Sequence, residues 1–128
     1  MIRVVIADDH GVVRAGLAQL LATFPDVELV GSAANGEEAV SLSAARDPDV
    51  VLMDLEMPVL DGIEATRRIR AAQPGVAVVV LTSFSDRERI LSALDAGAAG
   101  YLLKDAEPEA IARALEAAAR GESPLDPK

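Results

Sequence analysis

The feature of the sequence that most constrains its fold is a regular alternation of short apolar runs with longer segments of helical pattern. The apolar runs are rich in valine and isoleucine and occupy residues 2–7, 27–30, 50–53, 77–81 and 100–103. Two of them, 50–53 and 77–81, show no alternation of apolar and polar residues, which is typical of parallel strands covered on both faces. The sequence therefore predicts an α/β fold in which helices cover both faces of a parallel sheet.

The segments between the apolar runs carry helix start signals and apolar stripes. In three of them a capping residue stands three positions before a glutamate, at Asn35, Asp61 and Ser85, and this spacing predicts a capping box at each helix start. In the first and last helical segments, apolar residues recur at helical spacing at positions 13, 17, 20 and 21 and at 111, 115 and 118. Gly121 is predicted to end the last helix. Strict alternation of five strands and five helices with right-handed crossovers predicts a doubly wound sheet.

Composition limits the kind of protein that this chain can be. Its 128 residues, 51% of them hydrophobic, are enough for one contiguous core. No apolar stretch approaches the roughly 20 residues that span a bilayer, so we expect a cytoplasmic protein. The net charge of −9 argues against direct binding of this domain to nucleic acid. Because the chain has no cysteine and one histidine, any metal site is expected to use oxygen ligands.

Polar and charged side chains stand at four of the predicted strand ends. Asp8 and Asp9 follow the first strand, Asp54 the third, Thr82 the fourth and Lys104 the fifth. Because the carboxyl ends of parallel strands meet at one edge of the sheet, we expect these side chains to converge. Converging carboxylates repel one another, and a hard divalent cation that prefers oxygen ligands, such as Mg²⁺, would neutralise them.

The same residues suit the transfer of a phosphoryl group. The Lys104 ammonium and the Thr82 hydroxyl can hold phosphoryl oxygens, whose charge a catalyst of this reaction has to stabilise. None of the strand-end residues forms a hydroxyl nucleophile with a histidine partner, which leaves a carboxylate as the attacking group. Attack by Asp54 on phosphorus would give an acyl phosphate.

Taken together, these motifs resemble the signature of the response regulator receiver domains of two-component systems. The matching residues are Asp8-Asp9, the segment 54–58 with Asp61-Gly62, Thr82, and the segment 100–104. They extend over nearly the whole chain, and in combination they are specific although each alone is weak. The segments 8–10 and 100–105 further resemble the NarL/FixJ class, which is of the LuxR type.

The resemblance implies a flavodoxin-like fold with strand order 2-1-3-4-5 and a signalling role rather than an enzyme activity. It implies that Asp54 accepts a phosphoryl group from a sensor histidine kinase in a reaction that needs Mg²⁺, which Mn²⁺ can replace. The metal ligands would be Asp9, Asp54 and the backbone carbonyl of Glu56, and Asp8 would act through a bound water.

The resemblance also implies a switch. Lys104 would pair with the phosphoryl oxygens, Thr82 would move to hydrogen-bond them, and Tyr101 would turn inward behind Thr82. Glu56 and Phe84 would tune the access of water to the acyl phosphate and so its lifetime. The switch would control dimerisation and an output domain, which in the NarL/FixJ class is usually a C-terminal helix-turn-helix domain that binds DNA.

The ends of the chain and a few residues have simpler interpretations. The receiver is expected to span residues 1–121, and residues 122–128, with two prolines, are expected to begin the linker to the output domain. Asp105 stands where many receivers have a proline, so no cis peptide bond is expected there. His10 is expected only at the start of the first helix. The alanines at 110, 114, 117 and 118 either reflect helix propensity or permit a close dimer contact.

Two other protein classes share part of the pattern. Phosphohydrolases of the haloacid dehalogenase type also use carboxylates, Mg²⁺ and a lysine. Their nucleophile follows the first strand, however, and a second aspartate stands two residues later, where this chain has His10. A flavodoxin needs a phosphate-binding loop after the first strand and aromatic walls for the flavin, and neither is present. Rapid turnover of phosphate esters would favour the hydrolase.

Overall fold

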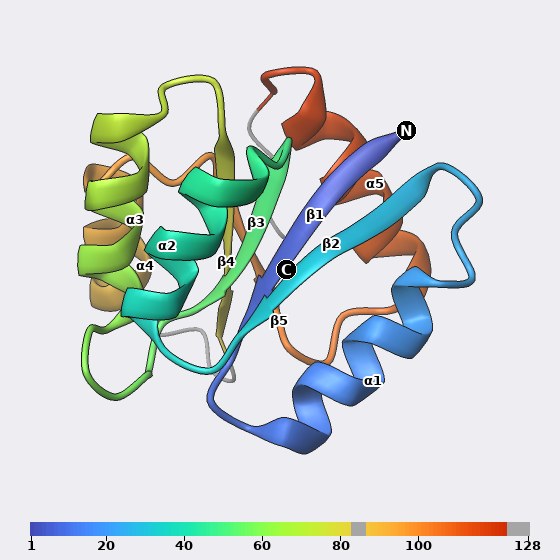
Figure 1. The fold of residues 1–128 in the computed structure, drawn as a ribbon, viewed down its shortest axis with the longest axis horizontal. Coiled ribbons are helices and arrows are strands. Elements are labelled where there is room, and N and C mark those ends of the chain that lie inside the picture. Colours follow the sequence, from blue (N-terminus) through green and yellow to red (C-terminus); the bar gives the residue numbers. More distant parts are fainter. Residues whose placement is uncertain (83–86, 123–128) are drawn as a thin grey trace.

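The computed structural model describes residues 1–82 and 87–122, in which five strands alternate with five helices (Figure 1). In chain order the elements are β1 (Ile2–Ala7), α1 (Gly11–Leu21), β2 (Val27–Ala33), α2 (Gly36–Arg46), β3 (Val50–Asp54), α3 (Gly62–Ala72), β4 (Ala77–Thr82), α4 (Arg87–Asp95), β5 (Gly100–Leu103) and α5 (Pro108–Ala119). The predicted alternation is confirmed. Within the described residues, no helix has both the length and the apolar character needed to cross a membrane.

The strands form one parallel sheet in the order β2-β1-β3-β4-β5. In Figure 1, α1 and α5 lie on one side of this sheet, and α2, α3 and α4 lie on the other. The predicted doubly wound, flavodoxin-like architecture is thus confirmed, including its strand order. Because the winding direction reverses between β1 and β3, the carboxyl ends of these two strands flank the crevice where such sheets bind ligands.

Residues of the central strands alternate between two hydrophobic cores. In β1, Val5 and Ala7 share a core with residues of α2 and α3, whereas Val4 and Ile6 share the other with residues of α1 and α5. All five residues of β3 are buried, as expected for a strand covered on both faces. Because a slip of one residue would exchange the two cores, this packing fixes the strand register and the level at which each strand ends.

Strand β2 is longer than the predicted segment 27–30, because it continues to Ala33. Its pairing with β1 shifts at a bulge between Val4 and Val5, after which Gly31 pairs with Val5. The added residues are small and lack the branched apolar side chains that mark a strand in a sequence, so the prediction was too short.

The ends of β3 and β4 bear on the site, and the end of α5 tests the prediction for Gly121. β3 and β4 each run one residue further than predicted, so that Asp54 and Thr82 are the last residues of their strands. After α5 ends at Ala119, Gly121 adopts a left-handed φ of 82°, in agreement with a glycine that ends a helix. Among the described residues no peptide bond is cis, which confirms the expectation for the bond after Lys104.

Two of the predicted helix caps are confirmed. Asn35 Oδ1 accepts a hydrogen bond from the Glu38 N–H at 2.9 Å, and Asp61 Oδ1 accepts one from the Glu64 N–H at 2.9 Å. Each cap satisfies a backbone donor that the helix itself leaves without a partner. The predictions for Phe84, for the Ser85 cap and for residues 123–128 fall outside the described residues.

Gly62 lets α3 begin directly against the end of β3. A Cβ atom on Gly62 would lie 2.0 Å from the carbonyl oxygen of Asp54 and 2.8 Å from the Cα atom of Leu55. The Gly62 N–H donates to the Leu55 carbonyl at 3.0 Å. Any side chain at this position would push helix and strand apart, so the glycine sets where α3 starts relative to Asp54.

Candidate functional site

Three charged side chains meet at the carboxyl ends of β1, β3 and β5. Lys104 Nζ lies 2.9 Å from Asp8 Oδ2 and 3.3 Å from Asp54 Oδ1. Asp8 is 0% exposed and Asp54 4% exposed, whereas the Lys104 side chain keeps 19% of its surface accessible. The predicted convergence of these strand-end side chains is therefore observed.

His10 contacts both carboxylates of the loop after β1, and Arg14 contacts the backbone of this loop. Asp8 Oδ1 accepts a hydrogen bond from the His10 backbone N–H at 2.9 Å. The His10 ring nitrogen Nδ1 lies 3.2 Å from the same oxygen and 3.1 Å from Asp9 Oδ1. Arg14, in the first turns of α1, donates from Nη1 to the Asp8 carbonyl at 2.7 Å. Both the backbone and the carboxylate of Asp8 are thus anchored.

Asp8 and Asp54 are two buried carboxylates that share one ammonium group. Burial raises the pKa of Asp54, and the negative charge of Asp8 raises it further, against the lowering effects of Lys104 and of the Glu56 N–H at 3.4 Å. Burial lowers the pKa of Lys104, but its contacts with Asp8 and Asp54 outweigh burial and leave that pKa raised. The site therefore carries more negative charge than Lys104 neutralises.

The three aspartates of this site fit a hard divalent cation. Asp8, Asp9, His10 and Asp54 each offer one ligand atom, and these atoms lie within 4.8 Å of one another. The Oδ2 atom of Asp54 is buried and has no hydrogen-bond partner among the described residues, which leaves it bonding capacity for an incoming group. Asp8 Oδ2 also lacks an aligned hydrogen bond, but Lys104 contacts it as an ion pair. Carboxylate oxygens are the ligands that Mg²⁺ and Mn²⁺ prefer.

Two further predicted site residues lie on the neighbouring strands. Thr82 is buried, and its carbonyl accepts a hydrogen bond from the Lys104 N–H at 2.8 Å. Tyr101 in β5 is partly buried and packs against the core on the side of α2, α3 and α4. The end of β4 is therefore joined directly to the residue that carries the ammonium group.

Three residues contact the site although the strand-end pattern does not mark them. The sequence predicts for His10 only a helix start, yet its ring contacts Asp9. Arg14 and Arg89 stand on helices, where no strand-end signal identifies them. Arg89 Nη1 lies 2.5 Å from Glu56 Oε1 and so joins α4 to the loop after β3. The one available signal was that His10 directly follows the acidic pair.

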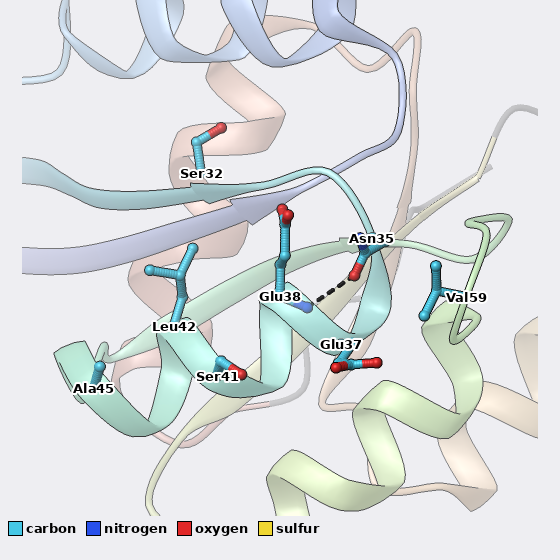
Figure 2. Close-up of a pocket in the computed structure, with 8 residues that line it drawn as sticks. All are labelled: Ser32, Asn35, Glu37, Glu38, Ser41, Leu42, Ala45 and Val59. Carbon is cyan, nitrogen blue, oxygen red and sulfur yellow. Dashed lines mark hydrogen bonds between the residues drawn. The ribbon is translucent and has the colours of Figure 1, made fainter.

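An open surface hollow lies elsewhere, between β2 and α2, and Figure 2 shows its lining. The lining residues are Ser32, Asn35, Glu37, Glu38, Ser41, Leu42, Ala45 and Val59. The cap bond between Asn35 and Glu38 crosses this region, and Glu38 Oε1 accepts from the Ala34 N–H at 2.7 Å. Asn35 and Glu38 thus serve the start of α2, and none of the residues lining the hollow is a cation that could join its carboxylates in phosphoryl chemistry.

Comparisons with known sequences agree with this geometry. The sequence matches the response regulator receiver domain family over residues 4–116. It is 46% identical over 128 residues to the transcriptional regulatory protein LiaR of Bacillus subtilis, covering 100% of this chain and 61% of LiaR. It is 42% identical over 127 residues to the response regulator protein VraR of Staphylococcus aureus, covering 99% of this chain and 61% of VraR. The chain spans about three fifths of the length of these relatives.

Solved structures show the same likeness in three dimensions. A LuxR family two-component response regulator from Aurantimonas sp. SI85-9A1 is similar with a TM-score of 0.91 at 35% identity, covering 98% of this chain and 89% of that chain. The signal receiver domain of NarL from Mycobacterium tuberculosis is similar with a TM-score of 0.90 at 35% identity, covering 94% and 98%. The chain belongs to the response regulator receiver domain family, and its relatives are two-component transcriptional regulators of the LuxR/NarL type.

Proposed function

We propose that Asp54 of this receiver domain accepts a phosphoryl group from a sensor histidine kinase. The observation that carries the proposal is the difference in contacts between the two oxygens of its carboxylate. Asp54 Oδ1 is held by Lys104 at 3.3 Å and by the Glu56 N–H at 3.4 Å, whereas Oδ2 is buried with no hydrogen-bond partner among the described residues. Oδ2 is therefore the oxygen that is available to form a new bond.

In the proposed reaction, Asp54 Oδ2 attacks the phosphorus of a phosphohistidine on the kinase. The bond between phosphorus and the donor nitrogen breaks as the new oxygen–phosphorus bond forms, and the released imidazole keeps the electron pair and takes a proton from solvent. Lys104, which already contacts both Asp8 and Asp54, supplies positive charge beside the transferring oxygens. Such fixed charge contributes most of what phosphoryl transfer needs from a protein.

The metal site is proposed to consist of Asp9, Asp54 and the backbone carbonyl of Glu56, with Mg²⁺ or Mn²⁺ as the ion. When bound, the ion would neutralise excess carboxylate charge and stabilise the charge on the phosphoryl oxygens. Asp8 suits an indirect role through water, because it is fully buried and Lys104 already contacts its Oδ2 atom.

The switch is proposed to run from Thr82 to Tyr101. The backbone of Thr82 is tied to Lys104, so a movement of Thr82 toward phosphoryl oxygens would act on β5 as well. Tyr101 lies in β5 and is only partly buried, so an inward turn would bury more of its ring. Glu56 and Phe84 are proposed to set the access of water to the acyl phosphate.

The activity of the longer protein is part of the proposal. We place the receiver at residues 1–121 and assign residues 122–128 to the start of a linker that leads to a C-terminal DNA-binding output domain. One similar structure, from Staphylococcus aureus, is of a DNA-binding response regulator of the LuxR family. Phosphorylation would favour a homodimer in the cytoplasm, and with a net charge of −9 the receiver itself would leave DNA contact to the output domain.

The proposal is tested by incubation with acetyl phosphate, with and without Mg²⁺, followed by intact mass measurement. The wild type should gain a single phosphoryl group only when Mg²⁺ is present, and Asp54→Asn should gain none. Asp26→Asn is the matched control, because Asp26 is an exposed aspartate just before β2, at the opposite end of the sheet.

Two results would contradict the proposal. Addition that persists in Asp54→Asn would move the acceptor to another residue. Rapid turnover of many phosphate esters without a stable adduct would favour a hydrolase of the haloacid dehalogenase type.

A further inference from the structure

His10 places an imidazole where a cation would approach the carboxylates. Its Nδ1 atom lies 3.1 Å from Asp9 Oδ1 and 3.2 Å from Asp8 Oδ1. The side chain is 66% exposed, so the ring is free on its outer side to turn into solvent. His10 is also the N-cap residue of α1 but makes no side-chain cap hydrogen bond, so the helix start does not depend on the ring.

Lys104 and His10 contact different oxygens of the site. Lys104 contacts Asp8 Oδ2 and Asp54 Oδ1, whereas His10 contacts Asp8 Oδ1 and Asp9 Oδ1. The Oδ2 atom of Asp54 is left without a hydrogen-bond partner among the described residues. Loss of the His10 ring would therefore release oxygens that Lys104 does not hold.

The two ring tautomers of His10 act on a metal in opposite ways. With its hydrogen on Nδ1, the ring donates to the carboxylates and occupies oxygens that an oxygen-seeking cation needs. With the hydrogen on Nε2, the Nδ1 lone pair faces the same position and can bind a metal. Mg²⁺ prefers oxygen ligands, whereas imidazole nitrogen is a good ligand for Zn²⁺.

We infer that His10 sets the metal preference of this site: its ring opposes Mg²⁺ and supplies a nitrogen ligand to Zn²⁺. The inference rests on the metal site of the proposed function. The zinc ligands would be Asp9, Asp54 and His10 Nδ1, three protein groups that leave one position of a four-coordinate ion open. Zn²⁺ would then compete with Mg²⁺ for the site that phosphorylation uses, and His10 would make this receiver sensitive to zinc.

The inference is tested by calorimetric titration of the tag-free chain with MgCl₂ and, separately, with ZnCl₂. Replacement of the ring in His10→Ala should change the two affinities in opposite directions. The Mg²⁺ Kd should fall by about threefold to tenfold, and the Zn²⁺ Kd should rise by about tenfold or more. His10→Asn should weaken Zn²⁺ binding in the same way, because its amide nitrogen has no lone pair for a metal. Asp26→Asn should leave both values unchanged.

Nitrogen-15 NMR gives a second readout that does not depend on phosphorylation. Because the chain contains one histidine, the imidazole region reports a single ring. Zn²⁺ should move the Nδ1 signal to that of a metal-bound nitrogen, and Mg²⁺ should move it toward that of a ring in solvent.

The outcomes separate this inference from the proposed function. Affinities that shift in the same direction in His10→Ala, or not at all, would overturn the inference alone, as would a zinc complex whose Nδ1 signal stays in place. A wild-type chain that binds neither ion would overturn the proposed metal site and the role of His10 with it.

Discussion

The two ends of the sheet use aspartate in opposite ways. At the amino end, the exposed Asp49 accepts a hydrogen bond from the Arg3 N–H at 2.8 Å, and Arg3 Nη2 donates to the Arg46 carbonyl at 2.5 Å. At the carboxyl end, Asp8 and Asp54 are buried and share one ammonium group. At the amino end, the aspartate is exposed to water and its carboxylate accepts a hydrogen bond. At the carboxyl end, the aspartates are buried at a cost in stability, and they keep oxygens available for a ligand.

The largest expected change in stability comes from a substitution that disturbs the backbone at the carboxyl end of the sheet. Gly62→Ala should destabilise the fold by about 4 kcal/mol, because its Cβ would overlap backbone atoms and could not be accommodated by a rotamer change. Urea unfolding followed by circular dichroism measures this change in the free energy of unfolding. Gly75→Ala, between α3 and β4 at the amino end, has nothing within 4 Å of the added Cβ and should change stability by less than about 0.5 kcal/mol. Equal effects of the two substitutions would remove the contrast between the ends.

The next largest effect is expected at the shared ammonium group. Lys104→Met should destabilise the fold by about 2–3 kcal/mol, because it leaves two buried carboxylates without their counter-charge. Arg120→Met removes an exposed partner of Glu122 and should leave the free energy of unfolding close to that of the wild type, because solvent screens such a pair. The same unfolding measurement applies, and Lys104→Arg should recover part of the loss. A Lys104→Met protein as stable as the wild type would show that the two carboxylates do not strain the fold.

The smallest expected change in stability is a gain, and its size depends on pH. Because the folded state raises the pKa of Asp54, protonation of this group stabilises the fold fully below its ordinary value of 3.8, and this stabilisation is lost as pH rises through the raised folded value. Asp54→Asn cannot ionise, so at pH 7 it should be more stable than the wild type by about 1 kcal/mol. The advantage should shrink toward pH 4.

Thermal unfolding across this pH range measures the difference, with Asp49→Asn as the control at the amino end. The control should show no gain at pH 7, because Asp49 is exposed and already accepts a hydrogen bond. A gain for Asp54→Asn that persists unchanged at low pH would mean that charge burial is not its cause.

The meeting of Asp8, Asp54 and Lys104 could be predicted from the sequence for a geometrical reason. In a parallel sheet every strand ends at the same edge, so a residue that follows an apolar run has little freedom of position. The doubly wound topology follows from the same alternation of strands and helices, because right-handed crossovers leave few arrangements. Both predictions depended on the backbone alone.

The contacts that the sequence did not predict depend on side chains and on breaks in regularity. The place of the His10 ring is set by two carboxylates on its own loop, and that of Arg89 by Glu56, far away in the sequence. Neither contact belongs to a periodic pattern or a fixed motif spacing that could be recognised in a sequence. The extension of β2 to Ala33 depends on a bulge in its pairing with β1, and small residues there carry no strand signal.

The glycine at the start of α3 has a mechanical consequence. Side chains between a helix and a strand act as a compliant layer that can absorb a small displacement, and no such layer separates Gly62 from the peptide group of Asp54. The start of α3 is therefore in direct backbone contact with the acceptor residue, and any displacement of the Asp54 backbone would move α3 with it. The loop after β3 is linked to α4 through the long side chains of Glu56 and Arg89 instead. Rotamer changes in these side chains can absorb a displacement of the loop before it reaches α4.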